Sequence, residues 1–211
     1  PINEKSAVGH GITISKPLYV KEIEREDGFK GLAVSGTPAD CVKLGMKSLL
    51  PFNPDLILSG INIGSNLGNN IIYSGTVAAA IEGATLDIPS IAISIDSYKP
   101  GSFSTSKIVV RKVINFMENN TIPSGTILNV NIPDCEPSDL KGYKVTSQGH
   151  QYFNDNFEKR ADPRGRDYYW MTGEIVDNDK ELRYDGFAVS NGYVSITPIH
   201  FTMTNKSFLD K

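Results

Sequence analysis

The sequence predicts an α/β protein, a three-layer αβα sandwich of the Rossmann-like type, and two observations support this fold class. Short apolar runs at 56–58 and 91–93 are bounded by proline and turn residues, which is typical of parallel strands that are covered on both faces. Between them, a polar loop at 59–68 leads into a run of good helix formers at 77–84. Strand, loop, helix and strand therefore follow one another as in a parallel α/β sheet.

The loop that precedes this helix is the first candidate site. Its three glycines, Gly60, Gly64 and Gly68, permit backbone conformations that other residues rarely adopt. Ser74 or Thr76 is the expected N-cap of the helix. A helix that starts beyond the carboxyl ends of such strands favours an anion, so the pattern predicts a phosphate-sized ligand. The alternative is that the glycines only form a tight turn and the hydroxyl residues only cap the helix.

The other elements follow from periodicity, taken along the chain. Alternating apolar residues and flanking turn residues predict strands at 12–14, 18–23, 31–34 and 127–132, with 18–23 and 31–34 forming an antiparallel hairpin against the main sheet. The helix-start residues at 35–40, with Pro38 near the first turn and Asp40 at a position that suits the helix dipole, predict a helix at 41–50. Apolar residues at helical spacing predict a helix at 107–117.

The composition changes after residue 142. We therefore expect an α/β core at 1–142 and a β-rich extension with a C-terminal tail at 143–211. A long hairpin is predicted from strands at 168–175 and 187–196, which flank an acidic turn. The aromatic and arginine residues of this part are typical of protein interfaces. A stacking platform for single-stranded nucleic acid is the alternative, but the acidic residues disfavour it.

The overall composition is that of a soluble globular protein. The chain has 211 residues, 39% hydrophobic and 21% charged, with a net charge of −3, so there is no basic excess that would indicate binding to a nucleic-acid duplex. Cys41 and Cys135 are far apart and form no metal-binding pattern, so a cytoplasmic location is expected. No apolar run approaches the roughly 20 residues that span a membrane, and the first residues are too charged for a signal peptide.

Four blocks of sequence resemble one known family in the order in which they occur. They are SAVGHGITISKPL at 6–18, SGTPADCVKLG at 35–45, SGINIGSNLG at 59–68 and YSGTVAAAIEG at 73–83. Together they resemble the SurE family of metal-dependent 5′/3′-nucleotidases, and further similarity lies at 125–133, 162–170 and 192–200. The resemblance implies a phosphomonoester hydrolase that releases phosphate from nucleoside 5′- and 3′-monophosphates. It also implies a homodimer or homotetramer, joined through the hairpin and C-terminal segment at 168–211.

The resemblance further implies a set of site residues. One divalent cation per subunit, Mg²⁺, Mn²⁺ or a similar ion, would be held by Ser6 and Asn62. Asn62 and Ser74 are the expected catalytic residues. The expected phosphate and substrate contacts are Ser74, Gly75, Thr76, Asn66, His10 and Asp40. For Ser6, His10 and Asp40, the residues alone leave structural roles open: a turn serine, a solvated loop residue and a helix cap.

The chain departs from the family at its N-terminus. Family members begin with a hydrophobic strand that ends in Asn-Asp-Asp-Gly, whose paired aspartates hold the metal. The chain contains no Asp-Asp pair, and residues 1–6 correspond to the loop after the second strand of the family. We therefore expect either a fragment or a protein with a further N-terminal segment. Two other functions stay open: a nucleotide- or phosphate-binding module without catalysis, and a structural oligomer with an inert cleft.

Overall fold

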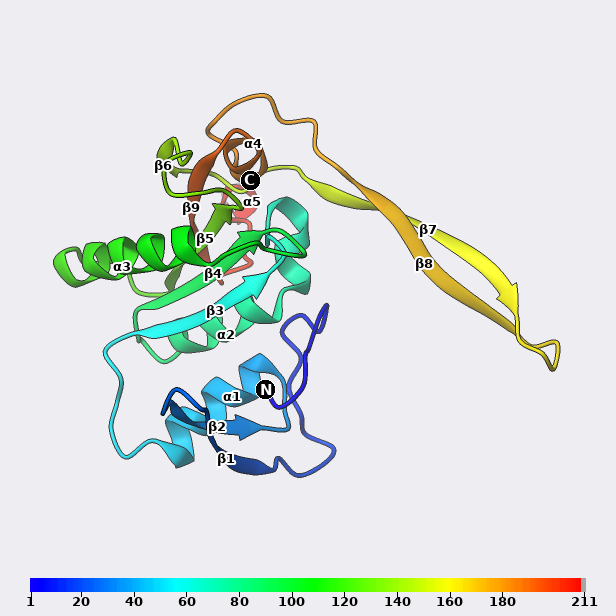
Figure 1. Ribbon diagram of the computed structural model, residues 1–211, viewed down its shortest axis with the longest axis horizontal. Coiled ribbons are helices and arrows are strands. Elements are labelled where there is room, and N and C mark those ends of the chain that lie inside the picture. Colours follow the sequence, from blue (N-terminus) through cyan, green and yellow to red (C-terminus); the bar gives the residue numbers. More distant parts are fainter. Residues whose placement is uncertain (210–211) are drawn as a thin grey trace.

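The computed structural model describes residues 1–209 and confirms the predicted α/β fold (Figure 1). A central five-stranded sheet has the order β3-β4-β5-β9-β6. Its parallel part consists of β3 (Ile57–Ile63), β4 (Ser90–Asp96) and β5 (Thr126–Pro133). The strand β9 (Tyr193–His200) is antiparallel to β5, and β6 (Gly142–Val145) is parallel to β9.

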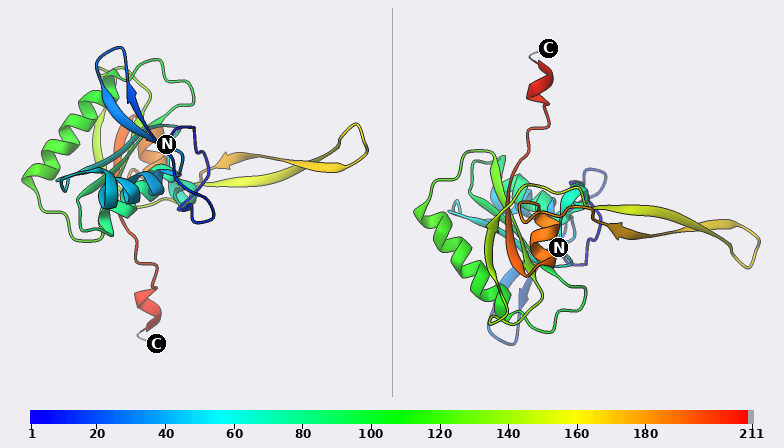
Figure 2. Two further views of the ribbon diagram at one scale, coloured as in Figure 1. Left: turned by 90° about the horizontal axis from the view of Figure 1, so that it is seen from below. Right: turned by 90° about the horizontal axis from the view of Figure 1, so that it is seen from above.

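Helices cover both faces of this sheet, which gives the predicted three layers (Figures 1 and 2). In β4, Ile93 packs with α3 (Ser104–Asn119), whereas its neighbour Ala92 packs with α2 (Gly75–Ala84), because successive side chains of a strand point to opposite faces. The helix α1 (Pro38–Leu44) packs against α2 and continues as a π-helical turn, Gly45–Leu49. None of the helices within residues 1–209 is both long and apolar enough to cross a bilayer.

The N-terminal part forms a small unit of its own. The predicted hairpin is present as β1 (Val20–Glu24) and β2 (Lys30–Val34), but it is a separate two-stranded sheet and does not join the central sheet. The strand expected at 12–14 is absent. Instead, the Thr13 N–H donates to the carboxylate of Asp40 at 3.0 Å, and the Ile14 side chain is exposed.

The C-terminal part corrects two expectations. Residues 168–175 lie in β8 (Asp167–Val176), whose partner is β7 (Tyr152–Ala161); the hairpin predicted with 187–196 does not form. Residues 187–196 instead contribute to α4 (Asp185–Ser190), which packs against β5 and β9, and to the first half of β9, which is a strand of the central sheet. A domain boundary at residue 142 therefore cuts through the sheet. The β7–β8 hairpin and the tail that carries α5 (Lys206–Leu209) are the parts that project from the body (Figure 2).

A 3₁₀ helix, Gly68–Tyr73, links the loop after β3 to the start of α2. It places the polar loop, the helix start and the carboxyl end of β3 next to one another in the chain. The predicted site residues Asn62, Asn66 and 74–76 therefore lie on one continuous segment that leaves the sheet at its carboxyl edge, whereas Ser6, His10 and Asp40 lie earlier in the chain.

Two glycines allow a test of how tightly α2 packs on the sheet. A Cβ at Gly83 would lie 2.7 Å from Ile57 Cδ1 and 3.3 Å from Ile57 Cβ, whereas a Cβ at Gly45, at the end of α1, would contact nothing within 4 Å. Gly83→Ala is expected to destabilise the protein by about 1–3 kcal/mol because overpacking outweighs the gain in helix propensity. Gly45→Ala is expected to stabilise it by up to about 1 kcal/mol. Urea unfolding measures both, and equal effects of the two substitutions would contradict the packing argument.

Candidate functional site

Asn62 lies at the carboxyl end of β3, where its side chain is held by the following turn. Its amide nitrogen Nδ2 donates to the carbonyl oxygens of Gly64 at 2.7 Å and Ile63 at 3.2 Å. Among residues 1–209, no hydrogen bond engages its oxygen Oδ1. The turn therefore fixes the amide and leaves an oxygen that can bind a ligand.

The start of α2 is the part of the candidate site for which the sequence predicts anion binding. Ser74 is its N-cap, and its Oγ accepts a hydrogen bond from the Val77 N–H at 3.1 Å. The hydroxyl hydrogen of Ser74 is thus available to donate. A Cβ at Gly75 would lie 2.9 Å from Pro38 Cγ and 3.1 Å from Val8 Cγ1, so glycine allows α1 and the N-terminal loop to approach this helix start. The amides of the first turn have no partner within the helix.

Asn66 is a buried residue of the loop after β3, and its contacts give it a structural role. Its Nδ2 donates to Ser94 Oγ at 2.7 Å, and its backbone N–H donates to Asn131 Oδ1 at 2.7 Å. Its carbonyl oxygen accepts from Asn129 and Asn131 at 2.9 and 3.0 Å. The prediction that Asn66 binds phosphate therefore has no support in these contacts. Asn129 and Asn131, both fully buried in β5, hold the loop in place.

The N-terminal loop is anchored to the last turn of α2. His10 Nε2 lies 2.8 Å from Glu82 Oε1, and Lys43 Nζ lies 3.0 Å from Glu82 Oε2. Glu82, a residue that the sequence did not single out, therefore joins the loop to both α2 and α1. This contact explains His10 without a substrate. Ser6 Oγ donates to Glu4 Oε1 at 2.6 Å on the exposed part of the same loop.

Asp40 lies at the other end of this unit and completes a capping box. Its Oδ2 accepts from the Thr37 N–H at 2.8 Å, and its Oδ1 accepts from the Thr13 N–H at 3.0 Å. Burial by itself raises the pKa of Asp40, but the hydrogen bonds from Thr13 and Thr37 outweigh it and hold the pKa below the ordinary value. Both carboxylate oxygens are thus engaged by backbone, and substrate binding by Asp40 has no support in this structure.

Asp185 ties the base of the hairpin to the loop after β3. Its side chain is fully buried and accepts hydrogen bonds from the backbone N–H groups of Gly68 at 3.0 Å, Gly149 at 2.9 Å and Gly186 at 2.8 Å. Burial raises the pKa of this carboxyl, and the three amides offset part of that shift. Gly68 has φ +53°, and a Cβ there would meet the backbone of Gln151. Asp185 was not predicted as a site residue because the sequence pattern placed it in the acidic turn of the expected hairpin.

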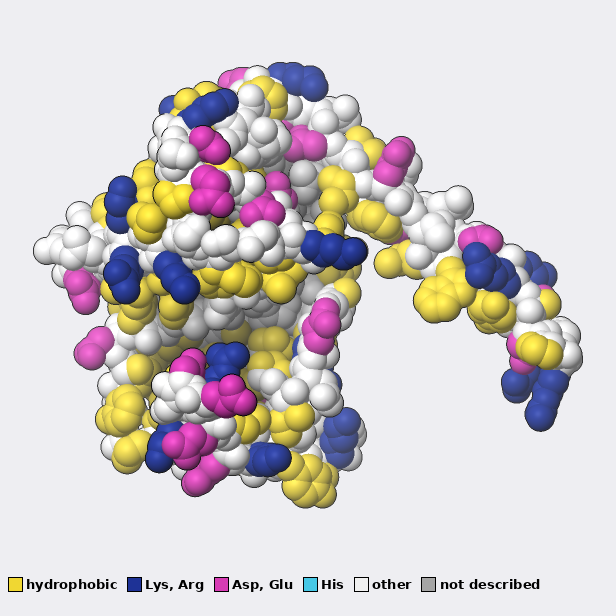
Figure 3. All heavy atoms as spheres, viewed as in Figure 1, with side chains coloured by type: hydrophobic (Ala, Val, Ile, Leu, Met, Phe, Trp, Pro, Cys, Tyr) yellow, Lys and Arg dark blue, Asp and Glu magenta, His cyan; other side chains and the backbone are white. Residues whose placement is uncertain are grey.

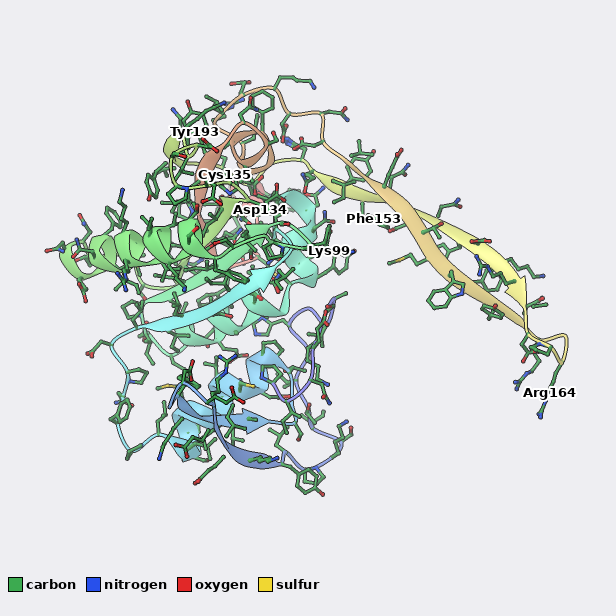
Figure 4. The ribbon with its side chains drawn as sticks, in the orientation of Figure 1. Lys99, Asp134, Cys135, Phe153, Arg164 and Tyr193 are labelled. Atoms are coloured by element: carbon green, nitrogen blue, oxygen red, sulfur yellow. The ribbon has the colours of Figure 1, made fainter. Side chains whose placement is uncertain are left out.

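A pocket opens at the carboxyl edge, between the loop after β3, the end of β4, α4 and the hairpin base. Its volume is about 300 Å³, and its lining is mixed: Ser65, Leu67, Asp96, Gln151, Ile175, Asp177, Asp179, Lys180, Gly186, Phe187 and Ser190. Figure 4 labels Phe153 near the hairpin base and Arg164 at the far tip of the hairpin, so only the base of this arm is close to the site.

The residues described here do not make a metal site by themselves. No group of three or more His, Cys, Asp or Glu side chains within residues 1–209 is placed to hold an ion. Ser6 and Asn62, the predicted ligands, supply two neutral oxygens, whereas divalent Mg²⁺ and Ca²⁺ sites use carboxylates. Asn62 belongs to β3, which is an outer strand of the sheet and has exposed Leu58 and Ile63 side chains.

Fold and site together define a Rossmann-like α/β protein with a polar pocket at the carboxyl edge of its sheet. Residues 1–155 match the family described as survival protein SurE, and the chain belongs to that family. It is 44% identical to the 5′-nucleotidase SurE of Thermosipho melanesiensis, over all of this chain and 83% of the relative. It is 48% identical to the 5′-nucleotidase SurE of Pelotomaculum thermopropionicum, over all of this chain and 81% of the relative.

A solved structure agrees with this assignment. The crystal structure of the SurE protein from Aquifex aeolicus superposes with a TM-score of 0.78 at 41% identity, covering 98% of this chain and 85% of that chain. The recognition made from the four sequence blocks is therefore confirmed.

The capping role of Asp40 predicts a pH-dependent loss of stability. Asp40→Ala is expected to lower the free energy of unfolding by about 1–3 kcal/mol at pH 7, because the Thr37 and Thr13 amides lose their acceptor. The pKa of Asp40 is lower in the folded state, so its contribution is complete above about 3.9 and fades as the pH falls further. Urea unfolding of variant and wild type at neutral and acidic pH measures this. Asp55→Ala, at an exposed carboxylate, is the control, and a difference that does not shrink in acid would refute the role.

Proposed function

We propose that the complete protein hydrolyses nucleoside 5′- and 3′-monophosphates and releases inorganic phosphate. The observation that supports this proposal is the start of α2, which follows β3 through a loop and a 3₁₀ helix and has Ser74 as its N-cap. The relatives named 5′-nucleotidase SurE, at 44 and 48% identity over the whole chain, support the same reaction.

In this proposal, each part of the segment at the start of α2 has its own role. The amides of Gly75 and Thr76 bind phosphate oxygens, aided by the positive end of the helix dipole. The Ser74 hydroxyl donates to the same phosphate because its oxygen already accepts from Val77. Such fixed donors stabilise charge on the phosphoryl oxygens as the ester bond breaks, without reorganisation of the site.

We propose that the reaction needs one divalent cation per subunit, Mg²⁺ or Mn²⁺. Asn62 Oδ1 is oriented for this by the two hydrogen bonds of its Nδ2, and Ser6 is its proposed neutral co-ligand. In the family pattern the anionic ligands are a pair of aspartates at the end of a strand, and the 211 residues contain no such pair. The outer edge of β3 offers unpaired backbone groups to such a strand.

A nucleotide-binding module without catalysis is the competing function, favoured by the absence of a clustered set of acidic ligands in residues 1–209. Phosphate release from a chromogenic monoester with added Mn²⁺ identifies an enzyme. Thermal stabilisation by a nucleoside monophosphate without turnover identifies a binding module.

A cytoplasmic location is proposed from the two cysteines, which are both free.

We also propose that the protein is a homodimer or homotetramer. The hairpin stands away from the body, and Figure 3 shows hydrophobic side chains clustered along it. Phe157 and Met171, which face each other in the register, are each about 60% exposed, as is Trp170. Large exposed apolar surfaces of this kind usually mark an interface.

The metal proposal predicts that the 211-residue chain binds Mn²⁺ poorly and hydrolyses little, because two neutral oxygens compete poorly with water. Adding an N-terminal strand that ends in Asp-Asp is expected to restore both properties, and exhaustive EDTA treatment is expected to abolish the restored activity. In that protein, Asn62→Ala is expected to lower turnover at least ~10-fold. Turnover within twofold of the unsubstituted protein, at saturating metal and unchanged Tm, would restrict Asn62 to shaping the turn.

The assembly proposal predicts a dimer or tetramer by light scattering at micromolar protein. Trp170→Ala is expected to shift the equilibrium toward the monomer because the hairpin loses its largest apolar side chain. Tyr19→Ala, which removes an aromatic that is 68% exposed on the N-terminal loop, is the matched control. Removal of residues 201–211, of which the last two lie outside the described residues, should weaken assembly before it disturbs the central sheet. A wild-type monomer would refute the proposal.

A further inference from the structure

The pocket at the carboxyl edge is continuous with the phosphate-binding segment. Ser65 and Leu67 line it and belong to the loop that runs from Asn62 to Ser74. Asp96 is the last residue of β4, and its neighbour Ile95 is paired with Ile63 of β3. Adjacent strands lie about 4.8 Å apart, so the pocket begins one strand away from Asn62. A substrate whose phosphate lies at α2 can therefore extend into it.

The charge of the pocket disfavours a phosphate group there. Asp96, Asp177 and Asp179 line it together with a single basic residue, Lys180. The local excess of negative charge repels a phosphate and attracts groups that donate hydrogen bonds. The start of α2 carries the positive end of a helix dipole, whereas the pocket carries an excess of acidic residues. This division would orient a substrate that has an anionic end and an uncharged end rich in donors.

Asp96 has a carboxylate oxygen left for a ligand. Its Oδ1 accepts from Ser65 Oγ at 2.6 Å, and no hydrogen bond within the described residues engages its Oδ2. Asp179 differs, because its two oxygens accept from the backbone and the ring of His150 at 2.8 and 2.9 Å. Asp177 also keeps an oxygen, Oδ2, that no hydrogen bond within the described residues engages, since only its Oδ1 accepts from the Asp179 N–H at 2.9 Å. Asp96 is the acidic residue of the pocket that is held by the loop leading to Ser74, because Ser65 belongs to that loop and orients it.

The remaining wall is apolar. Leu67 is buried beneath the pocket, and Phe187 and Ile175 contribute partly exposed side chains from α4 and β8. Aromatic and aliphatic surfaces of this kind bind the flat faces of bases. A volume of about 300 Å³ lies at the lower end of the range for small-molecule sites, which suits a nucleoside more than an oligonucleotide.

We propose that this pocket binds the nucleoside part of the substrate, with Asp96 accepting a hydrogen bond from a ribose hydroxyl and Phe187 contacting the base. Carboxylates fill this role toward ribose hydroxyls in other α/β crevices. The inference rests on the proposed function, because it assigns the second half of the substrate to a site whose first half is the start of α2.

The test compares substrates with and without a ribose, in the complete protein with its Asp-Asp strand. Asp96→Ala is expected to raise KM for adenosine 5′-monophosphate about 10-fold or more while kcat changes little. The ratio of kcat/KM for this nucleotide to that for p-nitrophenyl phosphate should fall by the same factor. Wild type should prefer adenosine 5′-monophosphate to its 2′,3′-dideoxy analogue, and Asp96→Ala should remove the preference.

Two further variants make the result decisive. Asp96→Asn keeps the shape and an acceptor oxygen but not the charge, so its effect should be intermediate. Asp134→Ala removes an exposed carboxylate that lies just past the end of β5 (Figure 4) and should leave every ratio unchanged. An unaltered ratio, or a retained preference over the dideoxy analogue in Asp96→Ala, would overturn the inference. Hydrolysis of p-nitrophenyl phosphate without any hydrolysis of nucleotides by wild type would instead overturn the proposed substrate class.

Discussion

The site depends on one constraint, the attachment of the loop after β3 to buried amide side chains of β5. Asn129 and Asn131 are fully buried, and both donate to the carbonyl of Asn66, whose own N–H is bound by Asn131. Burying amides is costly unless they are hydrogen-bonded, so the loop and the strand stabilise each other. Because the loop leads through the 3₁₀ helix to Ser74, this attachment helps to position the start of α2, the proposed phosphate-binding element.

A second attachment joins the same loop to the projecting hairpin. Asp185 accepts from Gly68 in the loop and from Gly149 just before β7. The Asn69 N–H donates to the carbonyl of Gln151 at 2.8 Å, and Gln148 donates to the carbonyl of Gly68 at 3.0 Å. Force applied to the hairpin by a partner subunit would therefore act on the loop of the site. This arrangement gives a physical route by which assembly and the site can influence each other.

The crevice is electrostatically divided, and the division follows from the topology. Parallel strands bring the start of α2 and the ends of β3 and β4 to one edge of the sheet. The helix start supplies positive potential, whereas α4 and the hairpin base bring Asp177 and Asp179 to the other side. In the proposed binding mode, the anionic end of the substrate lies at the start of α2 and its uncharged end lies in the pocket.

The sequence by itself determined the local elements and the family, because these depend on neighbours in the chain. A run of helix formers located α2, a short apolar run located β4, and periodicity located α3 and β5. The four sequence blocks identified the SurE family. Only the tertiary structure decided that β8 pairs with β7, that Asn66 is buried and that His10 contacts Glu82. These facts rest on contacts between distant residues: Gly68 and Asp185 are 117 positions apart. A sequence pattern indicates whether a residue is buried or polar. Which group forms a hydrogen bond with that residue depends on how the whole chain packs.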